Sequence, residues 1–176
     1  MFRGVVLFVA LLWAIFLADA LLPGTLHSHG LVPRTIPGLV GVVTMPFLHG
    51  NLGHIAANTL PLFVLLLVLG ATQRNPWPVA VEIAGVGGLL LWIFGRPGNH
   101  IGASLLIFGL IAFLVVAGFV QRKFLPVLAS LGVAVLYGGT LLWGILPLGD
   151  AGISWDGHLA GAVAGAATAM VTPSKP

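Results

Sequence analysis

Charged side chains are scarce in this sequence, and cysteine is missing altogether. Only 6% of the 176 residues are Asp, Glu, Lys or Arg, whereas 59% are hydrophobic and the mean hydropathy is +1.12. A soluble surface carries roughly 25–35% of mixed charges, so this composition excludes a soluble globular protein. The absence of cysteine excludes disulfides, thiolate metal sites and a cysteine nucleophile. The net charge of +3 is too small to indicate nucleic-acid binding.

Alternation of apolar and polar residues, the pattern of a membrane β-barrel, is also missing. The sequence has instead helix-length apolar runs separated by Pro, Gly and Arg. At about 20 residues per crossing, these runs predict an all-α integral membrane protein with six transmembrane helices in one domain, residues 1–176. The expected spans are Val5–Leu22, Leu52–Leu69, Val79–Phe94, Ser104–Val120, Pro126–Leu146 and Gly157–Val171, with a proline-rich loop over Pro23–Leu39.

The first apolar run also has a second interpretation. Arg3 before it and Ala18-Asp19-Ala20 after it imitate a cleavable signal peptide, whose removal would leave the following topology unchanged.

The distribution of Lys and Arg predicts the orientation in the membrane. With the amino terminus inside, the outside loops carry only Arg34 and Arg96. The inside segments then carry Arg3, Arg74, Arg122, Lys123 and Lys175. The positive-inside rule therefore favours cytoplasmic amino and carboxyl termini.

Polar residues on three different spans are predicted to lie at one depth. Counted from the inner helix ends, Ser104 lies about 24 Å, His158 about 21 Å and His54 about 24 Å up the membrane. In a hydrocarbon layer about 30 Å thick, this height is several ångströms below the outer surface. Polar side chains at such a depth are costly unless they face a protein interior or a water-filled cavity. They are therefore candidates for function.

The residue types indicate acyl-transfer chemistry. A serine hydroxyl becomes a good nucleophile when a base within hydrogen-bond reach takes its proton, and His158 is the base we expect for Ser104. Gly157, Gly161 and Gly165 recur at helical spacing, which predicts close packing between the two helices that carry this pair. The alternative is that these glycines serve packing alone, that His158 is a satisfied interior histidine, and that Ser104 bonds its own backbone.

His54 and Asn58 share a helix face and can both point at one oxygen, as a developing oxyanion requires. His49 precedes their helix and is expected to brace it. A metal site built from His49 and His54 is the competing interpretation, but no carboxylate or clear third ligand lies nearby, so we expect no metal and no cofactor. His100 is expected to be a solvated loop residue.

In order along the chain, the pattern is His49-x4-His54-x3-Asn58, then Gly102-x-Ser104, then His158-x2-Gly161. It resembles the rhomboid intramembrane serine proteases over nearly the whole chain. The resemblance implies a six-helix core and a Ser104/His158 dyad without an acid. It also implies an oxyanion site formed by His54, Asn58 and the Ser104 backbone amide, with His49, Gly102 and Gly161 in supporting roles.

Three positions depart from the family pattern. Leu105 stands where glycine usually follows the serine, and its side chain must lie either toward a neighbouring helix or over the substrate path. The Trp-Arg pair of the first loop is missing, with Val40 and Gly41 near that place. Phe108 stands one turn after the serine, where tyrosine is common.

We interpret the sequence as a serine endopeptidase that hydrolyses peptide bonds in or near transmembrane segments of membrane-protein substrates. Its expected setting is the cytoplasmic membrane of a prokaryote, with the active site opening to the outer face. An alternative is a catalytically weak or inactive rhomboid-like protein that binds transmembrane helices. A small-molecule transporter is disfavoured because paired intramembrane charges and repeated halves are not detected.

Overall fold

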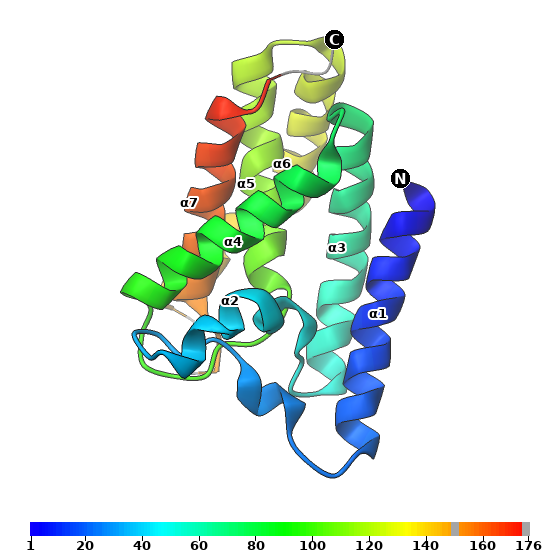
Figure 1. Cartoon of the computed structure of the whole chain (residues 1–176). Coiled ribbons are helices and arrows are strands. Elements are labelled where there is room, and N and C mark those ends of the chain that lie inside the picture. The colour runs from blue at the N-terminus through cyan, green and yellow to red at the C-terminus, as the bar shows by residue number, and fades with distance from the viewer. Residues whose placement is uncertain (149–151, 174–176) are drawn as a thin grey trace.

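The computed structural model describes residues 1–148 and 152–173, and its regular elements over these ranges are all helices. The α-helices are α1 (Phe2–Leu21), α2 (Gly41–Thr44), α3 (Leu52–Thr72), α4 (Pro76–Phe94), α5 (Ser104–Gln121), α6 (Phe124–Gly144) and α7 (Trp155–Val171) (Figure 1). The all-helical class expected from the sequence is confirmed. Lys175, expected on the inner side, lies outside the described residues.

The expected count of six crossings is slightly off. Among the described helices, five are long and apolar enough to cross a membrane, namely α1, α3, α4, α5 and α6. α7 has only 17 residues. At 1.5 Å per residue it reaches about 26 Å, a little less than the hydrocarbon thickness of about 30 Å.

Helix starts follow local capping. α3 begins at Leu52 as predicted, because the Asn51 side chain accepts a hydrogen bond from the His54 backbone N–H at 2.8 Å. α7 begins at Trp155, two residues earlier than predicted, because Ser154 caps it through the Gly157 N–H at 3.3 Å. α6 also begins earlier, at Phe124. Its Pro126 lies in the first turn, where a missing N–H costs no helical hydrogen bond.

The segment between α1 and α3 is more structured than the expected loop. It contains α2 and three short 3-10 helices, η1 (Leu26–His29), η2 (Pro37–Leu39) and η3 (Met45–Phe47). Pro37 begins η2 and Pro46 lies within η3. The fixed φ of proline favours a helical turn, and its missing N–H prevents a long helix from running through it. In Figure 1 this segment crosses beside the lower ends of α3 and α4.

α5 is the most deeply buried of the long helices, and α7 packs along it in the same direction. A Cβ on Gly161 would collide with the Leu105 carbonyl, and one on Gly165 with the Gly109 carbonyl. The two backbones therefore touch at successive turns. This is the close packing that the glycine spacing predicts.

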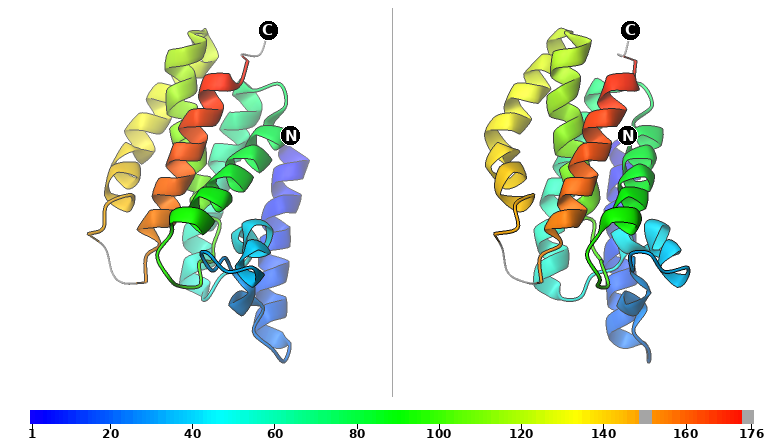
Figure 2. Two further views of the ribbon diagram at one scale, coloured as in Figure 1. Left: turned by 60° about the vertical axis from the view of Figure 1, so that its left-hand side comes forward. Right: turned by 90° about the vertical axis from the view of Figure 1, so that its left-hand side faces the viewer.

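α6 packs on the bundle mainly through its first half. Its buried residues are Pro126, Ser130 and Val133, and the Ser130 hydroxyl donates to the Val115 carbonyl at 2.9 Å. In both views of Figure 2, α6 forms one side of the bundle. The second half of α6 borders a cavity, and its last residue, Gly144, contacts the first turn of α7 through its carbonyl.

Candidate active site

A cavity of about 1050 Å³ lies at the end of the bundle where α3, α5 and α7 begin. Its walls come from α3, α5, the second half of α6, the start of α7 and the loops that precede α3, α5 and α7. Ser104, His158, His54 and Asn58 all line it. The polar residues that the sequence predicts at one depth on three spans therefore share one cavity.

Ser104 is the first residue of α5, and Gly102 sets its position. Gly102 has φ +109°, and its N–H donates to the Met45 carbonyl at 2.9 Å. A Cβ at Gly102 would meet the imidazole of His54 and would lie 3.5 Å from Asn58 Nδ2. Glycine is required here both by the backbone conformation and by the two α3 side chains that press against it.

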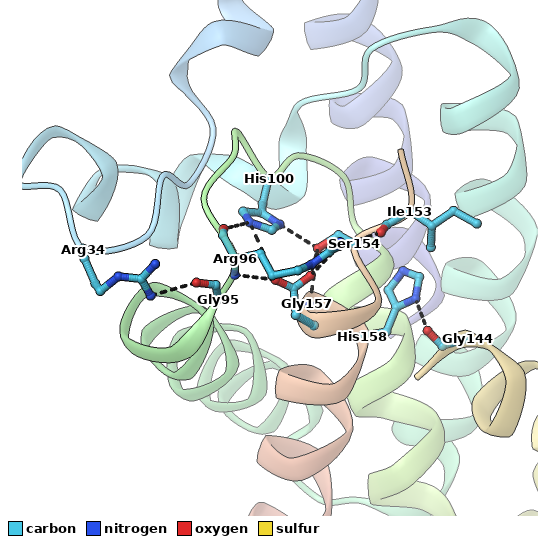
Figure 3. Close-up of polar contacts among 10 residues, drawn as sticks. Arg34, Gly95, Arg96, His100, Gly144, Ile153, Ser154, Gly157 and His158 are labelled. Carbon is cyan, nitrogen blue, oxygen red and sulfur yellow. Dashed lines mark hydrogen bonds and ion pairs between the residues drawn. The ribbon is translucent and has the colours of Figure 1, made fainter. Parts of the chain in front are cut away.

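His158 lies in the first turn of α7, and its ring contacts Gly144 (Figure 3). Its Nδ1 lies 2.9 Å from the Gly144 carbonyl oxygen. Because a carbonyl only accepts, Nδ1 carries the proton and Nε2 keeps a lone pair. The ring stacks on Phe108, with centroids 4.0 Å apart and planes within 4°. A Cβ at position 144 would collide with the Phe108 ring, so the stack of Phe108 on His158 requires glycine at this position.

Ser104 and His158 line the same cavity, but no hydrogen bond joins them among the described residues. Catalytic hydrogen bonds are often long before substrate binds and tighten in the complex. The geometry therefore brings the predicted nucleophile and base to one site with the correct free nitrogen on the base.

His54 and Asn58 lie one turn apart on α3, and both border Gly102. Asn58 is 6% exposed. Its Nδ2 has no hydrogen-bond partner among the described residues. A buried amide donor without a partner carries a free-energy penalty of about 1–3 kcal/mol. An oxygen bound beside Gly102 would remove that penalty.

His49 is 2% exposed and packs edge-on to His54, with ring centroids 5.0 Å apart. Neither ring nitrogen reaches a partner at hydrogen-bond geometry among the described residues. His49 precedes α3, outside the spanning helices. Burial first and the His54 ring second lower the pKa of His49 to about 4, with the Phe47 backbone opposing the shift. The imidazole is thus neutral and braces the His54 ring by contact.

This pKa predicts an acid-dependent loss of stability. The unfolded chain, with a pKa of 6.5, binds more protons than the folded chain between pH 6.5 and about 4, so stability falls as the pH decreases through that window. His49→Phe removes the titration and should reduce the fall by about 3 kcal/mol at most. Thermal unfolding of both proteins in detergent at pH 4.5 and pH 7 measures the difference. Equal acid sensitivity would contradict the assignment.

Comparison with known proteins settles the family. The family model described as the rhomboid domain matches residues 37–175, which include every cavity residue named above. The chain belongs to the rhomboid family. Uncharacterized proteins of Mycobacterium bovis and Mycobacterium tuberculosis are each 44% identical to it over 173 residues, covering 93% of this chain and 72% of the relative. An uncharacterized protein of Mycobacterium leprae is 38% identical over 174 residues, covering 93% of this chain and 68% of the relative. With its apolar helices, this rhomboid is an integral membrane protein.

Leu105, the departure after the serine, packs toward a neighbouring helix in this rhomboid. It is 2% exposed, clusters with Leu31, Met45 and Leu91, and does not line the cavity. A Cβ on Gly87 of α4 would lie 2.8 Å from Leu105 Cδ2. Gly87 therefore makes the room that Leu105 fills, and the interpretation in which Leu105 narrows the substrate path is wrong.

The first loop of this rhomboid is held by a tryptophan and an arginine from other positions. Trp92 of α4 donates through Nε1 to the Thr35 carbonyl at 2.9 Å. Arg34 donates through Nη1 to the Gly95 carbonyl at 2.7 Å and to the Ile93 carbonyl at 3.2 Å. The two Arg34 bonds satisfy carbonyls at the end of α4, and together with the Trp92 bond they attach the loop to this helix. The residues are distant in sequence, so no local motif indicates them.

Sequence reasoning also missed the residues around His100. The expected solvated loop residue is only 7% exposed and bonds Ser154 and the Arg96 backbone (Figure 3). Asp156 is 9% exposed and pairs with Arg96. Over the described residues, no group of three or more His, Asp or Glu side chains has the spacing to hold a metal ion.

Proposed function

We propose that this rhomboid is an intramembrane serine endopeptidase that cleaves transmembrane segments of other membrane proteins. The observation that carries the proposal is the His158 tautomer. The bond from Nδ1 to the Gly144 carbonyl leaves the Nε2 lone pair as the basic atom of a histidine that shares a cavity with Ser104. Stacking on Phe108 limits rotation of the His158 ring about its Cβ–Cγ bond, because such a rotation would tilt the ring out of the stack.

In the first step, Ser104 Oγ attacks the carbonyl carbon of the scissile peptide bond while His158 Nε2 takes the hydroxyl proton. The π electrons of the carbonyl move onto its oxygen, which gives a tetrahedral oxyanion and an imidazolium. The Gly144 carbonyl supports the imidazolium because it already accepts from Nδ1. No acidic side chain is required in this dyad.

We expect three groups to donate hydrogen bonds to the oxyanion. Ser104 opens α5, so its backbone N–H belongs to the first turn, whose amides have no partner within the helix. The partial positive charge at that helix end also favours an anion. Asn58 Nδ2 and the His54 ring border Gly102, two residues before the serine, and complete the set.

Collapse of the tetrahedral intermediate restores the carbonyl and breaks the peptide C–N bond. His158 gives its proton from Nε2 to the departing amine, so the new amino terminus leaves neutral and an ester to Ser104 remains. Water then attacks the ester with His158 as base, and the proton returns to Ser104 Oγ. The net reaction consumes one water and yields a carboxylic acid and an amine.

Charge placement supports a cavity that opens to the outer face. The end of the bundle with the cavity holds Arg34 and Arg96, whereas the opposite end holds Arg3, Arg74, Arg122 and Lys123. The positive-inside rule puts the more basic end in the cytoplasm.

A substrate helix must unwind at the cavity, because its carbonyls are otherwise held in internal hydrogen bonds.

The test is hydrolysis of a reporter that carries one transmembrane segment, by purified protein in lipid vesicles, with the cut mapped by mass spectrometry. We expect a single region of cleavage on the outer side of the segment. Folded protein that binds the reporter without producing fragments would favour the alternative of a helix-binding rhomboid without activity.

Asn58→Ala tests the oxyanion donors separately. Loss of one full donor should lower kcat by about 10²–10³, and by less if His54 and the backbone amide share the charge. Because Asn58 Nδ2 bonds no other described group, the variant should fold and bind the reporter with an unchanged KM. Steady-state kinetics on the reporter measure both constants. A raised KM with unchanged kcat would make Asn58 a binding residue instead.

A further inference from the structure

Two segments that hold the proposed catalytic residues are joined by polar side chains at the cavity end of the bundle. One is the loop from Gly95 to Ala103, which leads directly into Ser104. The other is the start of α7, which runs from its cap Ser154 through Asp156 and Gly157 to His158. Figure 3 shows the contacts between them.

The first contact is between His100 and Ser154. His100 Nε2 donates to the Arg96 carbonyl at 3.0 Å, which leaves Nδ1 free to accept from the Ser154 hydroxyl at 2.7 Å. The Ser154 carbonyl in turn accepts the backbone N–H of His158 at 3.0 Å. A chain of two hydrogen bonds therefore runs from the Ser104 loop to the backbone of His158.

The second contact is between Arg96 and Asp156. The Asp156 carboxylate accepts the Arg96 backbone N–H at 2.7 Å and Nη2 at 3.2 Å. Arg96 also donates to the Ile153 carbonyl at 3.0 Å, and its guanidinium lies 5.1 Å from the Trp155 ring centroid. A buried carboxylate with several donors is a strong and directional attachment.

These contacts lie before the first glycine contact. Gly161 touches the backbone of Leu105, so glycine packing joins α5 and α7 from the residue after Ser104 onward. The polar contacts attach the segments that come before it, and helix ends fray unless they are attached. Ser104 and His158 both lie in first turns, so their separation depends on how those ends are held. Catalytic rates are sensitive to this separation, because a displacement of about 1 Å can cost about 10²-fold.

We infer that His100 and Asp156 are positioning residues that set the separation of Ser104 from His158 by joining the loop before α5 to the first turn of α7. This inference rests on the proposed function for its catalytic consequence, whereas the attachment itself is a property of the fold. His100 and Asp156 do not touch the reacting atoms. They act through the Ser154 cap and the Arg96 backbone.

The experiment compares His100→Ala, His100→Asn and Asp156→Asn with the parent. The asparagine at position 100 keeps an acceptor for the Ser154 hydroxyl. Asp19→Asn is the matched control, because Asp19 also accepts backbone N–H groups and pairs with a histidine, His27, at this end of α1 but away from the cavity. Two readouts are taken: hydrogen exchange of the Gly157 and His158 amides, and kcat with KM on the reporter.

We expect faster exchange at both amides in His100→Ala and in Asp156→Asn. We also expect kcat to fall about tenfold or more with KM little changed, and most of the loss to be recovered in His100→Asn. Asp19→Asn should leave both readouts at the parent values. The inference would be overturned if folded His100→Ala exchanged both amides at the parent rate. It would also be overturned if the parent is active and His100→Ala exchanged faster but kept the parent kcat.

The two proposals fail separately. If the parent has no activity, the proposed function fails, and the amide exchange alone still tests whether His100 and Asp156 hold the first turn of α7. If His100→Ala does not fold, the same two readouts on Asp156→Asn decide. Parent-like exchange and kcat in Asp156→Asn would contradict the positioning role.

Discussion

Ser104→Ala and His158→Ala are each expected to abolish hydrolysis of a transmembrane reporter, with kcat lowered about 10⁴-fold or more. The nucleophile and the base act as one unit, so the double variant should be no slower than either single variant. Both should fold, because Ser104 forms no side-chain hydrogen bond among the described residues and His158 forms one, to the Gly144 carbonyl. Reporter cleavage by equal amounts of folded protein measures the loss.

Residual activity above about a tenth of the parent in Ser104→Ala would point to another nucleophile. Ser154 would be the next serine to test, because it lines the same cavity and bonds His100. Activity that disappears only in the Ser104→Ala, Ser154→Ala double variant would contradict the proposed dyad.

Leu105→Gly is expected to destabilise the protein by about 2–4 kcal/mol without opening the cavity. In water, truncating a buried leucine costs about 2.7–5 kcal/mol, part of which is transfer from water. Lipid is as apolar as leucine, so in a membrane mainly the packing part remains, and glycine within a helix adds about 1 kcal/mol. Because Leu105 does not line the cavity, the ratio of kcat in Leu105→Gly to kcat in the parent, per folded molecule, should be the same for small and large substrates.

Gly87→Leu tests the same contact from α4. Its side chain would meet Leu105 and lie close to the Gly161 backbone, and overpacking of this kind costs about 1–3 kcal/mol. Combining it with Leu105→Gly should recover part of the stability of both single variants. Gly85→Leu is the matched control, since a Cβ there has nothing within 4 Å. Thermal unfolding in detergent measures all four, and additive losses in the double variant would contradict the Gly87–Leu105 fit.

The sequence predicts the helices of this rhomboid well because their signals are local. Apolar runs bounded by Pro, Gly and Arg indicate the spans, and α3 begins after Asn51 as predicted. α7 begins two residues before its predicted start, because Ser154 caps it. The depths predicted for Ser104, His158 and His54 follow from helix rise alone, and these three residues line one cavity together with Asn58. The glycine spacing on α7 likewise predicts its close contact with α5.

The remaining features depend on contacts between distant segments. The Arg34 and Trp92 bonds join a loop to a helix about 60 residues away in the chain. The Leu105 side chain packs toward α4 because Gly87 has no side chain and leaves room for it. The residues around Ser104 in the sequence do not indicate this contact. His100 and Asp156 read as ordinary loop residues until the fold buries them against each other. A single sequence carries no local signal for such pairings.

The most direct measurement is covalent labelling of the folded, membrane-reconstituted protein with a fluorophosphonate, followed by mass-spectrometric mapping of the modified residue. We expect phosphonylation at Ser104 alone, at a rate that falls steeply in His158→Ala and only moderately in His100→Ala. Labelling of a different residue, or no labelling of protein whose fold is verified by thermal unfolding, would contradict a Ser104 nucleophile activated by His158.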